Sequence, residues 1–205
     1  MRLMHRRAAV AGPANPLVIV AVVAGLVTCA LVAAVAHAGA VENPSAARAV
    51  TPGGGVRAER DITWRHVGGD TLTLDAFLPA RAASDRPAVL LLHGGGWHAG
   101  DKASLDPEAQ RLAGLGYDAF SVNYRLAPAH PYPAAVDDVE AAVQWLRDPT
   151  QVRHFGLDPH RIGALGSSAG AHLAGMLATL GHGPRDRGAR VRAAVSWSGP
   201  MGLVD

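Results

Sequence analysis

Cysteine is almost absent from this chain of 205 residues, and acidic residues are absent from its first part. Cys29, the only cysteine, lies in an apolar run, so removal of that segment would leave no thiol and would exclude disulfides and cysteine catalysis. The first acidic residue is Glu42, and residues 1–38 hold three arginines, which leaves 19 − 3 = 16 basic against 17 acidic side chains. Because no cluster of Lys and Arg follows the pattern of a phosphate-binding surface, no nucleic-acid partner is predicted.

The motifs of metal and phosphate sites are also missing. No histidine pair has a metal-ligand spacing such as H-E-x-x-H, so no metal site is predicted. The sequence "HGGG" lacks the G-K-[ST] ending of a phosphate-binding loop. We therefore expect no cofactor, and a small molecule as the partner of the site. The sequence predicts nothing about oligomeric state.

The N-terminal segment has the features of an export signal. A basic start, "MRLMHRR", precedes an uncharged run from Leu17 to Ala36, and the small residues "AHAGA" follow. Ala36 and Ala38 fit the small-x-small pattern that favours cleavage after Ala38. The run also has the length of about 20 residues that crosses a bilayer as a helix, so a retained membrane anchor is the alternative. Both interpretations place the domain outside the cytoplasm, secreted or held at the membrane.

Three regions follow from this pattern. Residues 1–38 are the signal peptide or anchor, and residues 39–60 form a flexible linker rich in Ala, Gly and Pro with no apolar period. The folded domain covers residues 61–205.

Strand and helix patterns alternate through the domain. "ITWRHV" and "TLTLDAFL" flank "GGD" as a predicted hairpin, and the continuous apolar "AVLLL" is typical of a central strand. Helical stripes follow, one of them in "AHLAGMLATLG", where Leu173, Met176, Leu177 and Leu180 are expected to face inward. The alternation predicts an α/β fold, with a mostly parallel sheet covered by helices on both faces.

A candidate nucleophile lies in "GSSAG", residues 166–170. A serine hydroxyl is a weak nucleophile, so hydrolysis needs it exposed, beside a base, with N–H donors aimed at the oxyanion that forms. G-x-S-x-G between a strand and a helix is the sharp turn that presents such a serine, here Ser168. In a chain of this length and composition, a G-x-S-x-G string occurs by chance with a probability of roughly one in ten. Its place between a strand and a helix is therefore stronger evidence for a nucleophile than the string itself.

The second motif, "HGGG" at residues 93–96, ends the "AVLLL" strand. Glycines there let backbone N–H groups face a substrate, so Gly94 and Gly95, together with the N–H of Ala169, are the predicted oxyanion hole. An ordinary strand-to-helix turn is the alternative for these glycines. Trp97, which follows them, either walls an acyl pocket or packs in the core.

At this point a resemblance is evident. "LLHGGGWHAGDK", "VNYRLAP", "HPYPAAVDDVEAAVQWL", "DPHRIGALGSSAGAHLA" and "SWSGP" resemble the α/β-hydrolase esterases of the hormone-sensitive-lipase-like and bacterial feruloyl-esterase-like groups. The resemblance implies the α/β-hydrolase fold, carboxylic-ester hydrolysis through an acyl-enzyme, and the same roles for Ser168, Gly94, Gly95 and Ala169. Trp97 and Tyr124 are the predicted substrate contacts. Ala129 departs from the family's "YRLAPEH", where Glu is usual.

Each histidine is weighed as a possible base. His172 is expected to pack beneath the turn that bears Ser168, away from the substrate side. His93 is expected to fix the glycine loop by hydrogen bonding, and His98 and His130 to lie at the pocket rim. Surface positions are expected for His66, His154, His160 and His182. Asp137 and Asp138 are interpreted as first-turn carboxylates that favour a helix dipole.

The activating residues are therefore expected beyond residue 205. In this fold the triad follows the order Ser, Asp or Glu, then His, and the residues after Ser168 supply one helix and one strand only. We expect the chain to be a C-terminally truncated fragment that lacks part of the fold and is inactive by itself. Two alternatives stay open: a peptidase or amidase on the same fold, and a non-catalytic relative that binds a ligand or protein.

Overall fold

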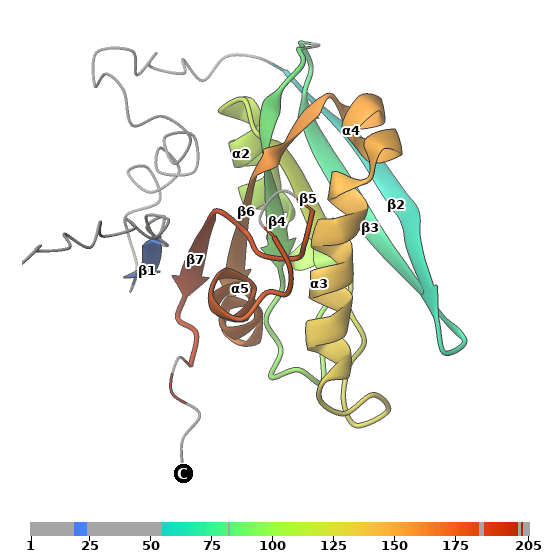
Figure 1. Cartoon of the computed structure of the whole chain (residues 1–205), viewed down its shortest axis with the longest axis vertical. Coiled ribbons are helices and arrows are strands. Elements are labelled where there is room, and N and C mark those ends of the chain that lie inside the picture. Colours follow the sequence, from blue (N-terminus) through green and yellow to red (C-terminus); the bar gives the residue numbers. More distant parts are fainter. Residues whose placement is uncertain (1–18, 24–54, 82, 185–186, 201, 203–205) are drawn as a thin grey trace, which may run out of the picture.

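The protein was analysed as a computed structural model that describes residues 19–23, 55–81, 83–184, 187–200 and 202. Within these ranges one sheet of seven strands has the order β1-β7-β6-β4-β5-β3-β2 (Figure 1). Its strands are β1 (Ile19–Val23), β2 (Val56–Val67), β3 (Asp70–Pro79), β4 (Arg86–Leu92), β5 (Asp118–Val122), β6 (Leu157–Ser167) and β7 (Ala193–Trp197). The helices are η2 (Lys102–Leu105, a 3-10 helix), α2 (Asp106–Gly114), α3 (Ala134–Arg147), α4 (Pro149–Phe155) and α5 (Ala169–Thr179).

The sheet is parallel at its centre and antiparallel at one side. β5, β4, β6 and β7 pair in parallel, whereas β3 pairs antiparallel with both β5 and β2. The predicted α/β architecture, a mostly parallel sheet with an N-terminal antiparallel hairpin, is thereby confirmed.

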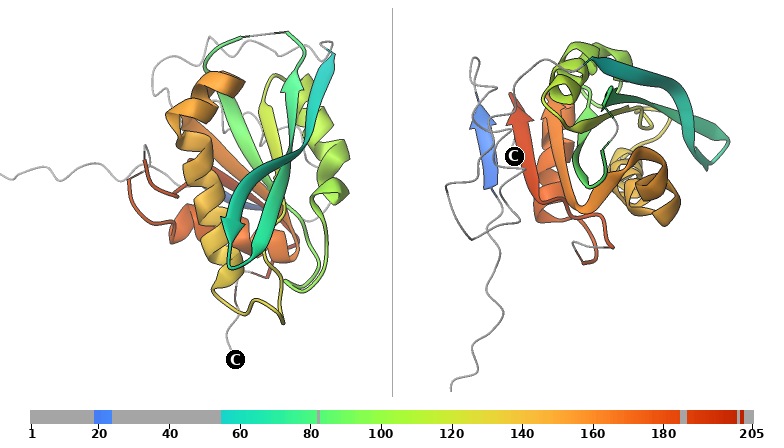
Figure 2. Two further views of the ribbon diagram at one scale, coloured as in Figure 1. Left: turned by 90° about the vertical axis from the view of Figure 1, so that its right-hand side faces the viewer. Right: turned by 90° about the horizontal axis from the view of Figure 1, so that it is seen from above.

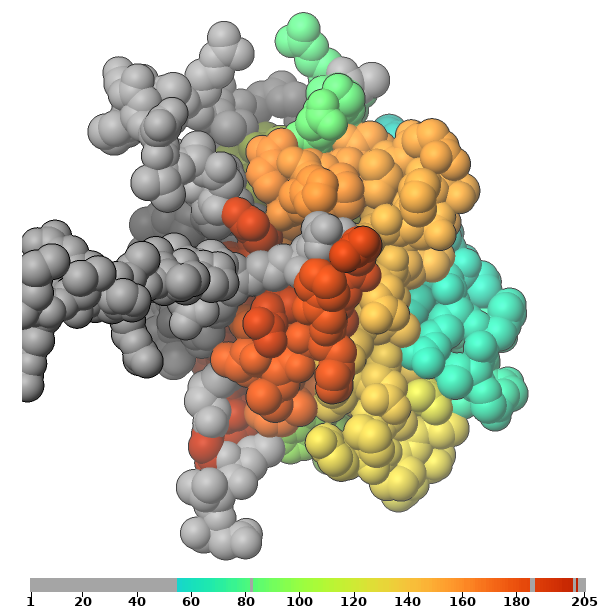
Figure 3. Space-filling view, viewed as in Figure 1, coloured from blue at the N-terminus to red at the C-terminus, as the bar shows by residue number. Residues whose placement is uncertain are grey.

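Helices cover both faces because β4 is apolar on both sides. Leu90 and Leu92 pack in one core cluster with residues of α3 and α5, while Val89 and Leu91 pack in a second cluster with residues of α2. The left view of Figure 2 shows α3 and α2 on opposite sides of the sheet. In the space-filling view, α3 and α4 cover the face toward the viewer, with the β2–β3 hairpin beside them (Figure 3).

Two boundaries differ from the expectation. β2 begins at Val56, before the expected domain start at Asp61, because Val56 to Glu59 pair with residues 76–79 of β3. Leu180 was expected to face inward but is 61% exposed, since α5 ends at Thr179 and the helical stripe ends with it.

Most of the predicted signal peptide or anchor and most of the linker lie outside the described residues. Of the predicted signal peptide or anchor, the structure describes Ile19–Val23. The anchor alternative places these residues in an apolar helix, but they pair as β1 with β7 in parallel, beside it in the right view of Figure 2. Without β1, the outer edge of β7 would present unpaired backbone N–H and C=O groups, and pairing with an apolar segment satisfies them. Over the part of the chain that the structure describes, none of the helices has the length and apolarity to span a membrane.

Candidate active site

Ser168 occupies a sharp turn between β6 and α5. Its backbone has φ 51° and ψ −116°, an uncommon conformation for a residue with a side chain, which costs about 1–3 kcal/mol and concentrates at functional sites. The residue is exposed, and its hydroxyl makes no capping hydrogen bond to α5. Its N–H donates to Trp197 O over 2.9 Å, which ties the turn to the end of β7.

Glycines make this turn possible by letting α5 approach the sheet. A Cβ added at Gly170 would lie 2.1 Å from Leu92 O, and one at Gly166 would lie 2.0 Å from Gly170 O. Both distances are far below contact, so these two positions of the G-x-S-x-G motif require glycine. The sequence folds as predicted here because only small residues fit beside Ser168.

The glycine motif begins a loop that lies against Ser168. We call residues 93–101 the oxyanion loop, after the role that the sequence predicts for Gly94 and Gly95. A Cβ added at Gly94 would lie 3.3 Å from Ser168 Cβ, so Gly94 lies beside the serine with little room for a side chain. Gly95 has φ +122°, and its carbonyl accepts from both His98 N and Ala99 N at 3.1 and 3.0 Å. The structure thus brings together Ser168, Ala169 and the two glycines that the sequence predicted to act with them.

His93 anchors the start of the oxyanion loop in the core. It is 1% exposed, and its Nδ1 lies 2.8 Å from Gly94 O. Because a carbonyl only accepts, Nδ1 carries the proton. Burial lowers the pKa of His93, against the hydrogen bond to Gly94 O, and thereby favours the neutral ring. The expected role of His93, fixing the loop by hydrogen bonding, agrees with this geometry.

Tyr124 lies beneath the oxyanion loop. It is 3% exposed, stacks on His93 with ring centroids 4.3 Å apart, and donates its hydroxyl to His93 O over 2.8 Å. Burial raises the pKa of this hydroxyl well above its ordinary value. Substrate contact by Tyr124 stays a prediction, but its hydroxyl already has a partner within the protein.

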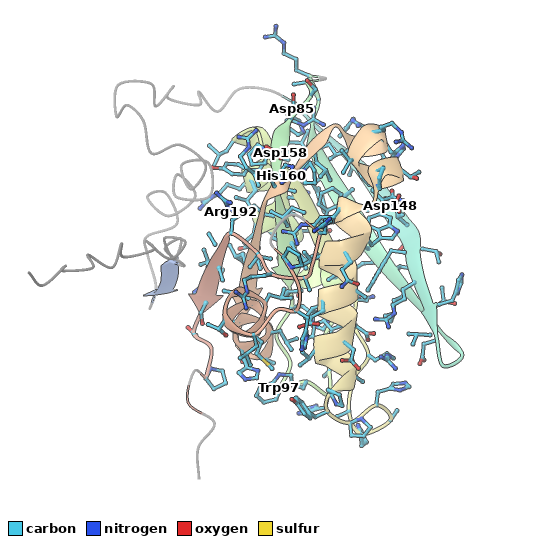
Figure 4. All side chains as sticks on the ribbon, viewed as in Figure 1. Asp85, Trp97, Asp148, Asp158, His160 and Arg192 are labelled. Atoms are coloured by element: carbon cyan, nitrogen blue, oxygen red, sulfur yellow. The ribbon has the colours of Figure 1, made fainter. Side chains whose placement is uncertain are left out.

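An apolar cavity of about 310 Å³ opens beside the oxyanion loop. The rings of Trp97 and His172 meet edge to face in its wall, with centroids 5.5 Å apart. Figure 4 labels Trp97 at the lower end of the molecule, beyond the ends of the parallel strands. The cavity is lined by Gly96, Trp97, Ala127, His130, Tyr132, Pro133, Ala135, Val136, His172 and Leu173.

The expected place of His172 beneath the turn is wrong. His172 lines the cavity, where its ring meets that of Trp97, a residue from the distant oxyanion loop. Burial lowers its pKa, and its Nδ1 is buried without a hydrogen-bond partner among the described residues. Of the two predicted rim residues, His130 does line the cavity and pairs with Asp70 at 3.0 Å. His98 lies beside Gly96.

The sequence also predicted positions for four further histidines and for Asp138. His66, His154, His160 and His182 are exposed, as predicted. Asp138, however, is fully buried and holds Arg125 and Arg65 at 2.9 and 2.8 Å, so it is an ion-pair centre and not only a first-turn carboxylate. Among the described residues, no group of three or more His, Cys, Asp or Glu side chains is placed to hold a metal ion.

The family model BD-FAE matches residues 74–205, which include the turn at Ser168, the oxyanion loop and the cavity. The chain belongs to the BD-FAE family. Among its relatives, this BD-FAE chain is 40% identical over 127 residues to carboxylesterase NlhH of Mycobacterium tuberculosis, a match that covers 60% of this chain and 39% of the relative. It is 39% identical over 104 residues to arylacetamide deacetylase of Bos taurus, covering 48% and 25%. The chain thus spans well under half the length of these relatives.

Solved structures agree with the fold. The apo form of Thermogutta terrifontis esterase 2 matches this BD-FAE chain with a TM-score of 0.62 and 27% identity, over 75% of this chain and 60% of that one. The same esterase phosphorylated by paraoxon matches with a TM-score of 0.60 and 26% identity, over 69% and 56%. The resemblance to α/β-hydrolase esterases is confirmed by both comparisons.

Proposed function

We propose that the protein is a serine carboxylic-ester hydrolase and that this chain carries its nucleophile and oxyanion hole. The observation that carries the proposal is the close approach of Gly94 to Ser168: an exposed serine in a strained turn lies beside a glycine loop. A serine held in this way reacts when donors surround the oxygen that becomes negative. The carboxylesterases among its relatives support this reaction class.

The proposed reaction has two steps. The Oγ of Ser168 attacks the ester carbonyl carbon, its proton passes to a general base, and the alcohol leaves with a proton as the acyl-enzyme forms. Water then attacks the acyl-enzyme, which releases the carboxylic acid and restores the serine hydroxyl. In both steps the carbonyl oxygen becomes negative, and the N–H groups of Gly94, Gly95 and Ala169 are proposed to bind it.

The substrate is proposed to be a small or medium ester with an apolar acyl or aryl group. The cavity beside the oxyanion loop supplies aromatic and aliphatic walls, Trp97 and Leu173 among them. Its volume of about 310 Å³ is at the lower end of ligand pockets, which favours compact groups.

An amide is the second candidate substrate. The relative arylacetamide deacetylase, 39% identical over the matched residues, is named for an amide substrate. Ester and amide hydrolysis share the same oxyanion and differ in the leaving group, so a paired assay with an aryl acetate and the matching aryl acetamide separates them.

A fluorophosphonate probe tests the nucleophile in the full-length natural protein. We expect one labelled peptide, the one that contains Ser168, and parallel loss of labelling and ester turnover in Ser168→Ala. Ser167→Ala is the matched control, since it removes the adjacent hydroxyl at the end of β6, and it should keep both. Labelling that persists in Ser168→Ala would disprove the assignment. A folded natural protein that neither labels nor hydrolyses esters would instead be a non-catalytic binding relative.

A further inference from the structure

We propose that Asn123 and Tyr124 are positioning residues of the reaction, because they hold the oxyanion loop at both of its ends. These two residues follow β5, which pairs with the strand that precedes the loop. The inference rests on the proposed function, because the role that it gives to Asn123 and Tyr124 is to orient a predicted oxyanion donor, the N–H of Gly95.

Tyr124 holds the start of the loop through His93. Its hydroxyl donates to His93 O over 2.8 Å, and its ring lies parallel to the imidazole within 10°. These two contacts fix both the backbone and the ring of His93. The ring in turn holds Gly94 O at 2.8 Å from Nδ1.

The contact at Gly94 O determines where the next N–H points. Gly94 O and Gly95 N–H belong to the same planar peptide group, and in a trans peptide they point in opposite directions. Holding the carbonyl oxygen against His93 therefore sets the Gly95 N–H on the opposite side of that plane. Hydrogen bonds that share a peptide group also polarise one another, which strengthens the N–H as a donor.

Asn123 holds the end of the loop. Its Oδ1 accepts from Lys102 N over 2.7 Å, and its Nδ2 donates to Asp101 Oδ2 over 3.0 Å. Its own N–H donates to Thr73 O at 3.0 Å, so the residue is fixed to β3. Asp101 Oδ1 accepts from Ala103 N and begins the 3-10 helix that follows.

Hydrogen bonds and close packing also hold the middle of the loop between these two ends. Gly95 O accepts from His98 N and Ala99 N, and a Cβ at Gly100 would lie 2.3 Å from Gly94 O. A shift at the Asn123 end therefore moves Gly100 against the carbonyl that His93 holds. The consequence is that both residues act on one peptide group, Gly94–Gly95, although neither belongs to the loop.

Tyr124→Phe in the full-length protein tests the first contact. The ring and its stacking remain, and only the hydroxyl bond to His93 O is lost. We expect kcat for a short-chain aryl ester to fall about 10-fold, part of the 10²–10³ that loss of a whole oxyanion donor costs, with KM unchanged. The inhibition constant of a trifluoromethyl ketone, which forms a hemiketal oxyanion on the serine, should rise by the same factor. Tyr117→Phe is the matched control: this buried tyrosine packs in the other core cluster, and its change should leave both constants as in wild type.

An exchange of partners tests the second contact. Asn123→Asp sets a carboxylate against Asp101, so kcat should fall and the inhibition constant should rise together. The double variant Asp101→Asn with Asn123→Asp restores one donor and one acceptor between the same positions. The double variant should recover most of kcat. If Asn123 has only a structural role, the loss of kcat in the variants should instead correlate with their thermal stability and not with the inhibition constant.

The two proposals fail in different ways. If the wild-type protein does not label at Ser168, the proposed function fails and the loop has no oxyanion to bind. If the wild type labels and turns over, but Tyr124→Phe and Asn123→Asp keep kcat and the inhibition constant, the proposed function stands and the positioning role is disproved.

Discussion

Gly94 lies beside Ser168 in the candidate active site: an added methyl at Gly94 would lie 3.3 Å from Ser168 Cβ and 3.1 Å from Ser167 O. These distances are tight but short of a clash. The backbone of Gly94 is outside the left-handed region, so alanine can adopt its conformation. This close approach therefore permits a substitution that disturbs the site more than the fold.

The first prediction is that Gly94→Ala keeps the fold and lowers turnover. We expect the melting temperature to change little, and kcat/KM for an aryl ester to fall about 10²-fold, because a displaced oxyanion donor costs this much. Gly114→Ala, where an added methyl meets nothing within 4 Å, is the control and should match wild type. Equal activity in the two variants would remove Gly94 from the oxyanion hole.

Gly95 should respond differently. An added methyl would lie 2.0 Å from Ala99 O at a φ of +122°, so any side chain must rearrange the loop. We expect Gly95→Ala to lower both turnover and the melting temperature, unlike Gly94→Ala. Circular dichroism melts of the two variants, measured side by side with their ester hydrolysis, check the contrast.

A second prediction concerns the buried carboxylate of Asp138. Its oxygens bind the Arg125 guanidinium and Arg125 N, and reach Arg65 Nη1 as well. Asp138→Asn leaves the half-buried guanidinium of Arg125 without its counter-charge, so the free energy of unfolding should fall by about 3 kcal/mol. Asp137→Asn changes an exposed neighbour and should change the free energy of unfolding by less than about 0.5 kcal/mol. Urea denaturation of both variants gives the comparison, and equal values would contradict the role of Asp138.

Asp138 also shows what the sequence could and could not predict. The hairpin, the alternation of strands and helices, and the placing of Ser168 and Gly94 follow from local patterns and chain connectivity. Asp138 was interpreted from its place in the first helical turn, although it lies four residues before the buried Ala142 and eight before the buried Leu146. That spacing places it on the buried stripe of α3, and a burial pattern of this kind was the available signal.

His172 was misplaced and Asn123 was missed for a different reason. Whether His172 packs below the turn or lines the cavity depends on Trp97, which arrives from a distant loop. The role of Asn123 depends on Lys102 and Asp101, 21 and 22 residues away in sequence. Contacts of this range are set by the folded sheet, and no local pattern of residues contains them.

A third prediction follows from the pKa of His172, which burial lowers. In the unfolded chain this histidine takes up a proton near its ordinary pKa of about 6.5, while the folded state stays neutral to lower pH. The unfolded state then binds more protons, so the free energy of unfolding falls as pH drops from 7.5 through 6.5 and below. His172→Phe should flatten this fall relative to wild type and keep the stability at pH 7.5 within about 1 kcal/mol. Identical slopes in the two proteins would show that His172 does not contribute.

The last prediction concerns Tyr132 at the mouth of the cavity. Its ring lines the cavity although the residue is 80% exposed, so it supports little of the core. Under the proposed function, an aromatic acyl group in the cavity would lie against this ring, and an aromatic pair contributes about 0.5–1.5 kcal/mol. Tyr132→Ala should therefore raise KM for an aryl-acyl ester about 3- to 10-fold, and leave KM for the matching acetate ester and the melting temperature unchanged. Trp97→Ala, which opens the cavity wall beside His172, should raise KM for both esters. The test is to measure KM of both variants for a series of nitrophenyl esters with acyl groups of increasing size. If Tyr132→Ala changes KM equally for acetate and aryl-acyl esters, the cavity does not hold the acyl group.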